Sequence, residues 1–186
     1  LCLTSVISAQ SLNNHAFCFY YNWFGSNEID GDNYHWAHPV MPENDKDTCT
    51  LYFPGDGNIG ADFYPASGEY SSSDSVTIER HMKEMASAGI GIIAVTWLGE
   101  NYYSYKSVPI ILDMANRYQL KVCFQIEPIV RKSPTTTKQE IEFIIKNFGS
   151  HPAFYREEAT KRPLFFIYDS YVIPAHEWFD VFGKND

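Results

Sequence analysis

The sequence predicts an α/β protein built on a parallel sheet, and three observations lead to that fold class. Near-continuous apolar runs, each short enough for one buried strand, recur along the chain. Helical patterns with an apolar stripe lie between these runs. Each of the later runs ends in polar or aromatic residues. Strands and helices that alternate at this spacing imply right-handed crossovers. The four units predicted here are half of a (β/α)8 barrel of the TIM type.

The predicted elements follow one another in chain order. We expect strands at residues 16–21, 90–97, 120–126 and 163–167, and helices at 74–88, 108–115, 137–148 and from 174 onward. Ser73 or Asp74 can cap the first of these helices, and Gly89 ends it. Thr137 and Glu140 form a predicted capping box for the third. Residues 22–73 lack a helical period, and their aromatic content favours an ordered loop over the barrel rim.

The composition and the two ends of the sequence limit which classes of protein the chain can belong to. The net charge of −9 argues against a general affinity for nucleic acid or anionic membranes. Four cysteines lack the spacing of a zinc site. Residues 1–15 are expected to be the end of a signal peptide or a disordered terminus, and 16–186 a barrel domain truncated at its C-terminus. The alternative is a small open α/β domain that is complete.

Glu127 is the leading candidate for a functional side chain. It ends the third apolar run and shares a strand face with Gln125 and Cys123, so we expect it to point to the barrel axis or its mouth. The C-terminal ends of barrel strands carry the catalytic groups of this fold. The alternative is a structural carboxylate paired with a lysine or arginine.

Other candidates follow the remaining strand ends. Trp97 ends the second run, while Tyr168 and Asp169 end the fourth and could bind sugar hydroxyls, unless Asp169 only caps a turn. Aromatic rings can stack on pyranose rings or cover the core, and three of them end the first strand: Tyr20, Tyr21 and Trp23.

The loop that follows the first strand adds a histidine and a tryptophan, His35 and Trp36. His35 and His38 lie three residues apart, but no third candidate ligand lies at a spacing typical of a metal site. Hydrogen bonding to a substrate or to the loop is therefore favoured over metal binding. No glycine-rich phosphate fingerprint follows any predicted strand, which weakens a nucleotide-binding hypothesis.

A series of motifs in order resembles glycoside hydrolase family 99, the endo-α-1,2-mannosidases. The resemblance extends from Phe17 to Tyr171. It rests on residues 19–25, 30–31, 34–36, 63–65, 68–74, 78–82, 88–91, 96–97, 126–128, 149–155 and 167–171. Their sequences include FYYNWFG, GEYSSSD, IEP, GSHPAFY and IYDSY.

The resemblance implies a (β/α)8 barrel that hydrolyses internal α-mannosidic bonds with retention. The sugar's own 2-hydroxyl would displace the leaving group through a 1,2-anhydro intermediate, without metal or organic cofactor. The catalytic carboxylates are expected beyond Asp186, so the 186 residues alone are expected to be inactive. Glu127 matches a position near the reacting sugar, and Trp97 matches a strand-end tryptophan. Leu98 stands where relatives carry an aromatic that contacts the sugar beyond the cleavage point, which leaves the glucose-versus-mannose preference open.

The expected partner is a high-mannose or glucosylated N-glycan in the secretory pathway, in the Golgi lumen or outside the cell. No nucleic-acid partner is expected, and the sequence does not define an oligomeric state. Two alternatives stay open. One is a catalytically silent carbohydrate-binding protein on the same barrel, and the other is a glycosyltransferase-associated relative of the barrel.

Overall fold

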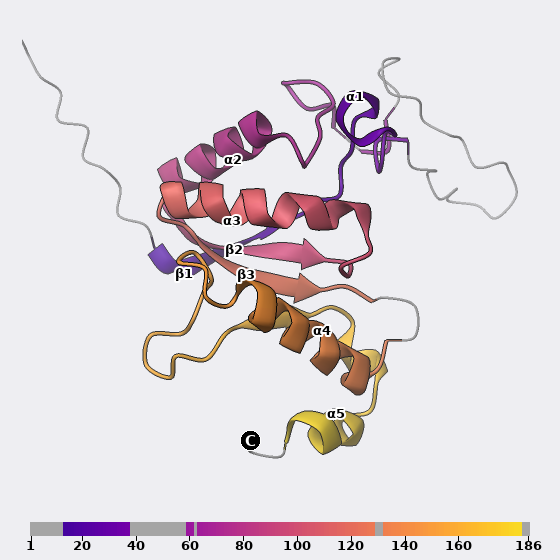
Figure 1. Cartoon of the computed structure of the whole chain (residues 1–186), viewed down its shortest axis with the longest axis vertical. Coiled ribbons are helices and arrows are strands. Elements are labelled where there is room, and N and C mark those ends of the chain that lie inside the picture. The colour runs from indigo at the N-terminus through magenta and orange to yellow at the C-terminus, as the bar shows by residue number, and fades with distance from the viewer. Residues whose placement is uncertain (1–12, 38–58, 62, 129–131, 184–186) are drawn as a thin grey trace, which may run out of the picture.

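The described part of the chain folds around a parallel sheet whose strands lie in sequence order, β1-β2-β3-β4 (Figure 1). The computed structural model describes residues 13–37, 59–61, 63–128 and 132–183. The strands are β1 (Asn13–Tyr20), β2 (Ile90–Trp97), β3 (Lys121–Ile126) and β4 (Phe165–Ile167). The predicted fold class is therefore confirmed, although β1 begins at Asn13 rather than at residue 16.

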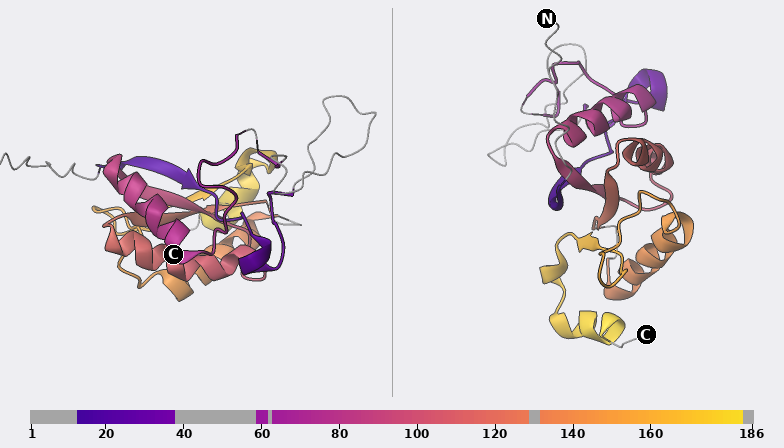
Figure 2. Two further views of the ribbon diagram at one scale, coloured as in Figure 1. Left: turned by 90° about the horizontal axis from the view of Figure 1, so that it is seen from above. Right: turned by 90° about the vertical axis from the view of Figure 1, so that its left-hand side faces the viewer.

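Helices cover one face of this sheet. The described helices are α1 (Asn27–Asp30), α2 (Ser75–Ser87), α3 (Ser107–Arg117), α4 (Pro134–Phe148) and α5 (Ala175–Phe182), with short 3-10 turns η1 (Tyr103–Lys106) and η2 (Ser170–Val172). Helices α2 and α3 lie together on the same side of the strands (Figure 2). None of the described helices is both long and apolar enough to cross a bilayer.

The sheet is curled, as the aromatic contacts across its open face show. The ring of Phe166 in β4 lies 6.1 Å from that of Phe17 and 5.4 Å from that of Phe19, both in β1. Three inter-strand spacings of about 4.8 Å would separate these strands by roughly 14 Å in a flat sheet. The rings meet because the edge strands bend toward each other, which makes the open face concave like the inside of a barrel.

Strand alternation divides the apolar residues between two layers. The helix-facing layer includes Val95 of β2 and Val122, Phe124 and Ile126 of β3, together with residues of α2, α3 and α4. The smaller inner layer includes Ile92, Ala94 and Cys123, covered by Leu164, Phe166 and Tyr155. The assignment of opposite faces within β3 is therefore confirmed. Among described residues, Cys123 is a buried free thiol and Cys18 a partly buried one.

The helix ends follow local chemistry, with one correction. Asp74 caps α2 by accepting from the backbone N–H groups of Val76 and Thr77, as predicted. The predicted capping box of α4 at Thr137 and Glu140 is wrong. Ser133 is the N-cap and forms the box with Thr136, and Pro134 occupies the first turn. Proline fits there because the first helical N–H has no intrahelical partner.

The segment after β1 is more structured than the absence of helical periodicity suggested. Residues 27–30 form the single turn α1, which Gly31 ends with φ of +79°. Such a short turn carries no periodic signal, so sequence patterns could not identify it. The signal-like residues 1–9, Cys2, Cys49 and His38 lie outside the described residues.

Candidate active-site rim

The acidic centre of the rim stands at the end of β3. Glu127 is 7% exposed, and its Oε1 accepts a hydrogen bond from the side-chain amide of Gln125. The backbone N–H of Glu127 donates to the carbonyl of Trp97, which continues the parallel ladder one residue past the strand. Because Cys123 lies in the inner layer, alternation places Gln125 and Glu127 on the inner face as well. Glu127 thus lies at the mouth of the curled sheet.

Two further charged groups act on this carboxyl. Burial raises the pKa of Glu127, and the negative charge of Asp169 adds to that shift. The amide of Gln125 and the ammonium of Lys132 oppose the shift without cancelling it. Burial likewise lowers the pKa of Lys132 against the opposing effect of both carboxylates. A buried carboxyl with a raised pKa in a barrel mouth is a typical functional group.

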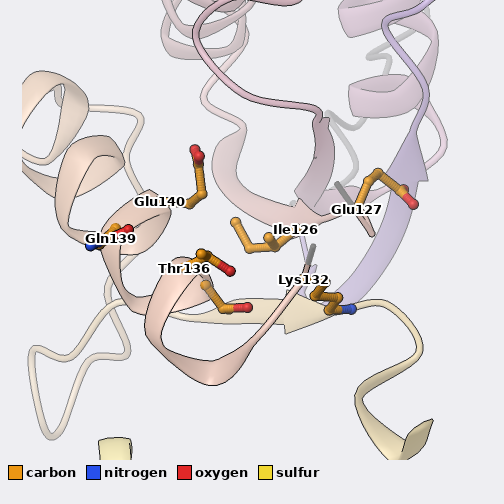
Figure 3. Close-up of a pocket in the computed structure, with 7 residues that line it drawn as sticks. Ile126, Glu127, Lys132, Thr136, Gln139 and Glu140 are labelled. Atoms are coloured by element: carbon orange, nitrogen blue, oxygen red, sulfur yellow. The ribbon is translucent and has the colours of Figure 1, made fainter. Parts of the chain in front are cut away.

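A cavity of about 160 Å³ adjoins Glu127 where β3 ends and α4 begins. Figure 3 shows Glu127 and Lys132 on one side of it, Gln139 and Glu140 on the other, and Ile126 between them. The remaining lining residues are Thr136 and Thr137. Lys132 therefore belongs to both the charged cluster and the cavity.

Trp97 does not lie at the mouth, contrary to the expectation from its position at a strand end. Its ring is 1% exposed and packs in the helix-facing layer against Phe124 and Phe143. Its Nε1–H donates to Oε2 of Glu140 at 2.6 Å. Alternation explains the placement, since Trp97 shares its face with Val95, whereas the preceding residue faces inward.

That inward-facing residue of β2 is Thr96, which carries neither the aromatic ring nor the acidic group expected at a strand end. Thr96 pairs in register with Gln125 of β3 and is 1% exposed. Its Oγ1 has no hydrogen-bond partner within the described part of the chain. Thr96 could have been identified from the sequence, because it follows the inner residues Ile92 and Ala94 at the alternate spacing of one strand face.

Three of the predicted aromatic residues form one stack beside β1. The rings of Tyr21 and Trp23 lie 4.6 Å apart at 17°, and those of Trp23 and His35 lie 4.7 Å apart at 7°. Tyr21 is 43% exposed, so the stack offers an aromatic face to solvent. Rings of this kind can pack against a sugar ring. The stack brings together residues from the strand end and from the loop that follows α1.

Tyr20 and Trp36 are buried instead. Tyr20 packs in the helix-facing layer, and its hydroxyl pairs with Nδ1 of His81 on α2 at 3.1 Å. Trp36 is 2% exposed, stacks on Phe24 at 4.2 Å and donates from Nε1 to the carbonyl of Tyr70 at 2.8 Å. Neither ring lies on the open face of the rim, because the one points into the helix layer and the other is enclosed by its loop.

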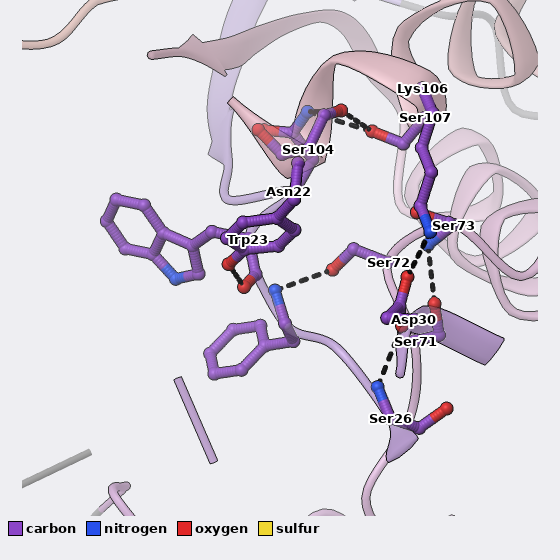
Figure 4. A network of polar contacts seen from close by, with 12 residues as sticks. Asn22, Trp23, Ser26, Asp30, Ser71, Ser72, Ser73, Ser104, Lys106 and Ser107 are labelled. Carbon is purple, nitrogen blue, oxygen red and sulfur yellow. Dashed lines mark hydrogen bonds and ion pairs between the residues drawn. The ribbon is translucent and has the colours of Figure 1, made fainter. Parts of the chain in front are cut away.

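Hydrogen bonds tie the loop after β1 to the loop after β2. Nδ2 of buried Asn22 donates to Oγ of Ser107 at 2.9 Å (Figure 4). The hydroxyl of Tyr103 donates to the carbonyl of Trp23. These two bonds hold the chain on both sides of Trp23, the tryptophan of the stack. The orientation of the aromatic stack therefore depends on residues some 80 positions away in the sequence, as the separations of 85 and 80 residues show.

An ion pair adds a third tie. Oδ1 of Asp30 lies 2.8 Å from Nζ of Lys106, and Oδ2 accepts from the backbone N–H of Ser26 at 2.8 Å (Figure 4). Burial alone would raise the pKa of Asp30. Hydrogen bonds from Lys106, Ser71 and Ser26, with the charge of the lysine, outweigh burial, so the pKa lies below its usual value.

The remaining candidates lie close to the rim but differ in exposure. Tyr168 is 48% exposed, and its backbone N–H donates to the carbonyl of Ile126. Asp169 adopts a left-handed backbone with φ of +51° and precedes the η2 turn. Leu98 is half-buried directly after β2. Within the described residues, no group of three or more acidic, histidine or cysteine side chains could hold a metal ion.

The comparisons with known proteins agree on one family. The family model described as Glycosyl hydrolase family 99 matches residues 11–185. The chain is 39% identical over 180 residues to the glycoprotein endo-alpha-1,2-mannosidase of Rattus norvegicus, covering 90% of this chain and 39% of the rat protein. It is 35% identical over 182 residues to the human glycoprotein endo-alpha-1,2-mannosidase-like protein, with coverages of 90% and 39%.

A solved structure gives the same result for the fold. The GH99 endo-alpha-mannosidase from Bacteroides thetaiotaomicron superposes with a TM-score of 0.84 at 41% identity, over 91% of this chain and 49% of that one. The chain thus spans about two fifths of the curated relatives and about half of the solved chain. The resemblance and the barrel fold inferred from sequence are both confirmed.

Proposed function

Since the chain belongs to glycosyl hydrolase family 99, we propose that it supplies the substrate-contacting rim of an endo-acting glycosidase that cleaves internal α-mannosidic bonds of N-glycans with retention. The observation that carries this proposal is the buried carboxyl of Glu127 at the inner end of β3, within the charged cluster of Lys132 and Asp169. The rat relative is named a glycoprotein endo-alpha-1,2-mannosidase, which supports the substrate class.

Glu127 is proposed to contact the reacting sugar. Its raised pKa increases the fraction of the protonated form, in which the carboxyl donates a hydrogen bond to a sugar hydroxyl. Gln125 holds Oε1 from one side and thereby limits the rotation of the carboxyl. The carboxylate pair that reacts is expected on a later strand of the barrel, as the family resemblance implies.

The aromatic stack of Tyr21, Trp23 and His35 is proposed as a platform for a second sugar residue. Its solvent-exposed member, Tyr21, combines an apolar ring face with a polar hydroxyl at the ring edge, which suits a pyranose. The substrate is proposed to be a high-mannose or glucosylated N-glycan, and the site of action the secretory pathway. No organic cofactor is needed for a hydrolysis of this kind.

The test separates binding from turnover. Binding of a glucosylated and of an unglucosylated high-mannose N-glycan is measured by titration calorimetry on the 186 residues. Turnover is measured on the longest reading frame that contains them, by mass spectrometry of the released saccharide. Glu127→Gln is compared with Glu142→Gln, an exposed carboxyl on the outer side of α4.

Release of a glucosyl-mannose or mannose product that Glu127→Gln reduces at least tenfold, with Glu142→Gln unchanged, supports the proposal. Glycan binding without any release favours the silent carbohydrate-binding protein. Turnover that both variants leave intact would remove Glu127 from the site.

A further inference from the structure

The aromatic stack of the rim contains a residue with a strained backbone. His35 has φ of +61°, in the left-handed region that residues other than glycine rarely adopt. In this conformation its ring lies flat on that of Trp23, at 4.7 Å and 7°. Residues in such conformations persist only where the surrounding structure holds them, and they gather at ligand-binding sites. The contacts that hold His35 against Trp23 are therefore candidates for a functional role.

Tyr103 of η1 acts on both halves of this stack. Its hydroxyl donates a hydrogen bond to the carbonyl of Trp23. Its ring stacks on that of Tyr34, the residue before His35, with the ring centroids 3.9 Å apart and the planes at 13°. Burial raises the pKa of Tyr103, so its hydroxyl stays protonated and remains a donor. One side chain thus holds the carbonyl of one stacked residue and the neighbour of the other.

The path of the loop depends on other contacts. The hydroxyl of Ser72 accepts from the backbone N–H of Phe24 at 3.1 Å (Figure 4). The backbone N–H of Ser72 in turn donates to the carbonyl of Phe24 at 2.7 Å, and that of Gly25 donates to the carbonyl of Tyr34 at 3.0 Å. These bonds keep the two segments of the stack side by side without the hydroxyl of Tyr103. Loss of that hydroxyl should therefore change the orientation of the rings and leave the fold intact.

We propose that Tyr103 is a positioning residue of the rim, which keeps Trp23 and His35 stacked so that the platform holds one orientation toward the glycan. The inference rests on the proposed function, because the stack is the platform proposed there for a second sugar residue. Tyr103 acts through the stack and does not itself contact the sugar. A platform that is already ordered loses little side-chain freedom on binding, which preserves affinity.

The experiment uses NMR on the 186-residue chain. Tyr103→Phe keeps the stacked ring and removes only the hydroxyl. The ring protons of His35 report the stacking, because the indole of Trp23 lies flat against them and shields them, and Trp23→Leu supplies the unstacked reference. Tyr118→Phe is the matched control, since it removes a hydroxyl that donates to Glu79 at 3.0 Å just past the other end of α3.

Two changes are expected in Tyr103→Phe. The chemical shifts of the His35 ring protons should move toward those of Trp23→Leu. Binding of α-1,2-linked mannobiose, followed by titration, should weaken about threefold or more, the effect of losing part of one ring contact. Tyr118→Phe should leave both quantities at their wild-type values, although it too loses a hydrogen bond. Circular dichroism of each variant shows whether it is folded.

The outcomes separate this inference from the proposed function. Unchanged His35 shifts in Tyr103→Phe overturn it, and so do equal effects of Tyr118→Phe, which would make the role one of general stability. Altered shifts with unchanged affinity overturn it as well, because the stack would then not contact the sugar, while Glu127→Gln still tests the proposed function. If the wild-type chain binds no mannobiose, the platform and this inference fail together, and turnover by the longer reading frame decides the proposed function separately.

Discussion

Replacing Trp97 by phenylalanine tests whether this residue stabilises the core or contacts a ligand. The indole is 1% exposed, and its N–H donates to Glu140 at 2.6 Å. A hydrogen bond to a charged group contributes about 1.5–3 kcal/mol. The smaller ring also leaves a void among Tyr105, Phe124 and Phe143, which costs about 1 kcal/mol more. Trp97→Phe should therefore lower the free energy of unfolding by about 2.5–4 kcal/mol.

Urea unfolding followed by circular dichroism at 222 nm measures this loss. Trp178→Phe is the control, because that indole donates to a backbone carbonyl, that of Ser170, at 2.9 Å in an exposed region. The control should lose about 1 kcal/mol or less. A double-mutant cycle of Trp97→Phe with Glu140→Gln should give a coupling energy of about 1–2 kcal/mol.

A different pair of results would refute the reasoning. If Trp97→Phe unfolds within about 0.5 kcal/mol of wild type and binds mannobiose tenfold more weakly, the indole faces the ligand and its placement in the helix-facing layer is wrong.

Three further predictions concern the helix cap and the two carboxyl groups. Ser133→Ala removes the acceptor for the backbone N–H of Thr136 and should lower the free energy of unfolding by about 1 kcal/mol in urea titrations; an unchanged midpoint would contradict the cap. Asp30→Asn weakens the pair with Lys106 and should cost about 1–2 kcal/mol at neutral pH. Because the pKa of Asp30 is lowered on folding, its contribution is present above the unfolded pKa and is lost as the pH falls through the folded pKa, so the deficit should shrink in acid. The raised pKa of Glu127 has the opposite sign: its contribution is present below the unfolded pKa and is lost as the pH rises through the folded pKa. Glu127→Gln should therefore gain stability relative to wild type as the pH rises from the unfolded pKa through the raised folded pKa of Glu127, measured by urea unfolding at each pH; a pH-independent difference would contradict the burial of the carboxyl.

Apart from the single turn α1, the strands and helices were predictable because each carries its own local signal. Apolar runs identified β2 and β3, and the stripe of Val108, Ile111 and Leu112 identified α3. The cap of α4 was misplaced because Thr137 and Glu140 have the same spacing as a capping box. Two features place the helix start at Ser133 rather than at Thr137. The backbone of Ser133 is extended, and Pro134 fits only the first turn of a helix.

The site was predictable only where the alternation of side chains along a strand, here called strand parity, decides which face of the sheet a residue occupies. Glu127 was found because parity and strand position agree. Trp97 was placed on the rim by position alone, although parity puts it on the helix side with Val95. Lys132 and Asn22 carried no signal, because their roles depend on contacts with residues from other units of the fold. Contacts of this kind follow from tertiary packing and cannot be read from spacing.

The ties between the loops of the rim have a consequence for engineering and for evolution. Asn22 to Ser107, Trp23 to Tyr103 and Asp30 to Lys106 join segments that are encoded more than 70 residues apart. A loop exchanged alone from a relative would arrive without its partners and would misalign the aromatic stack. The loops after β1 and β2 therefore form one transferable unit, and changes of specificity in either should require compensating changes in the other.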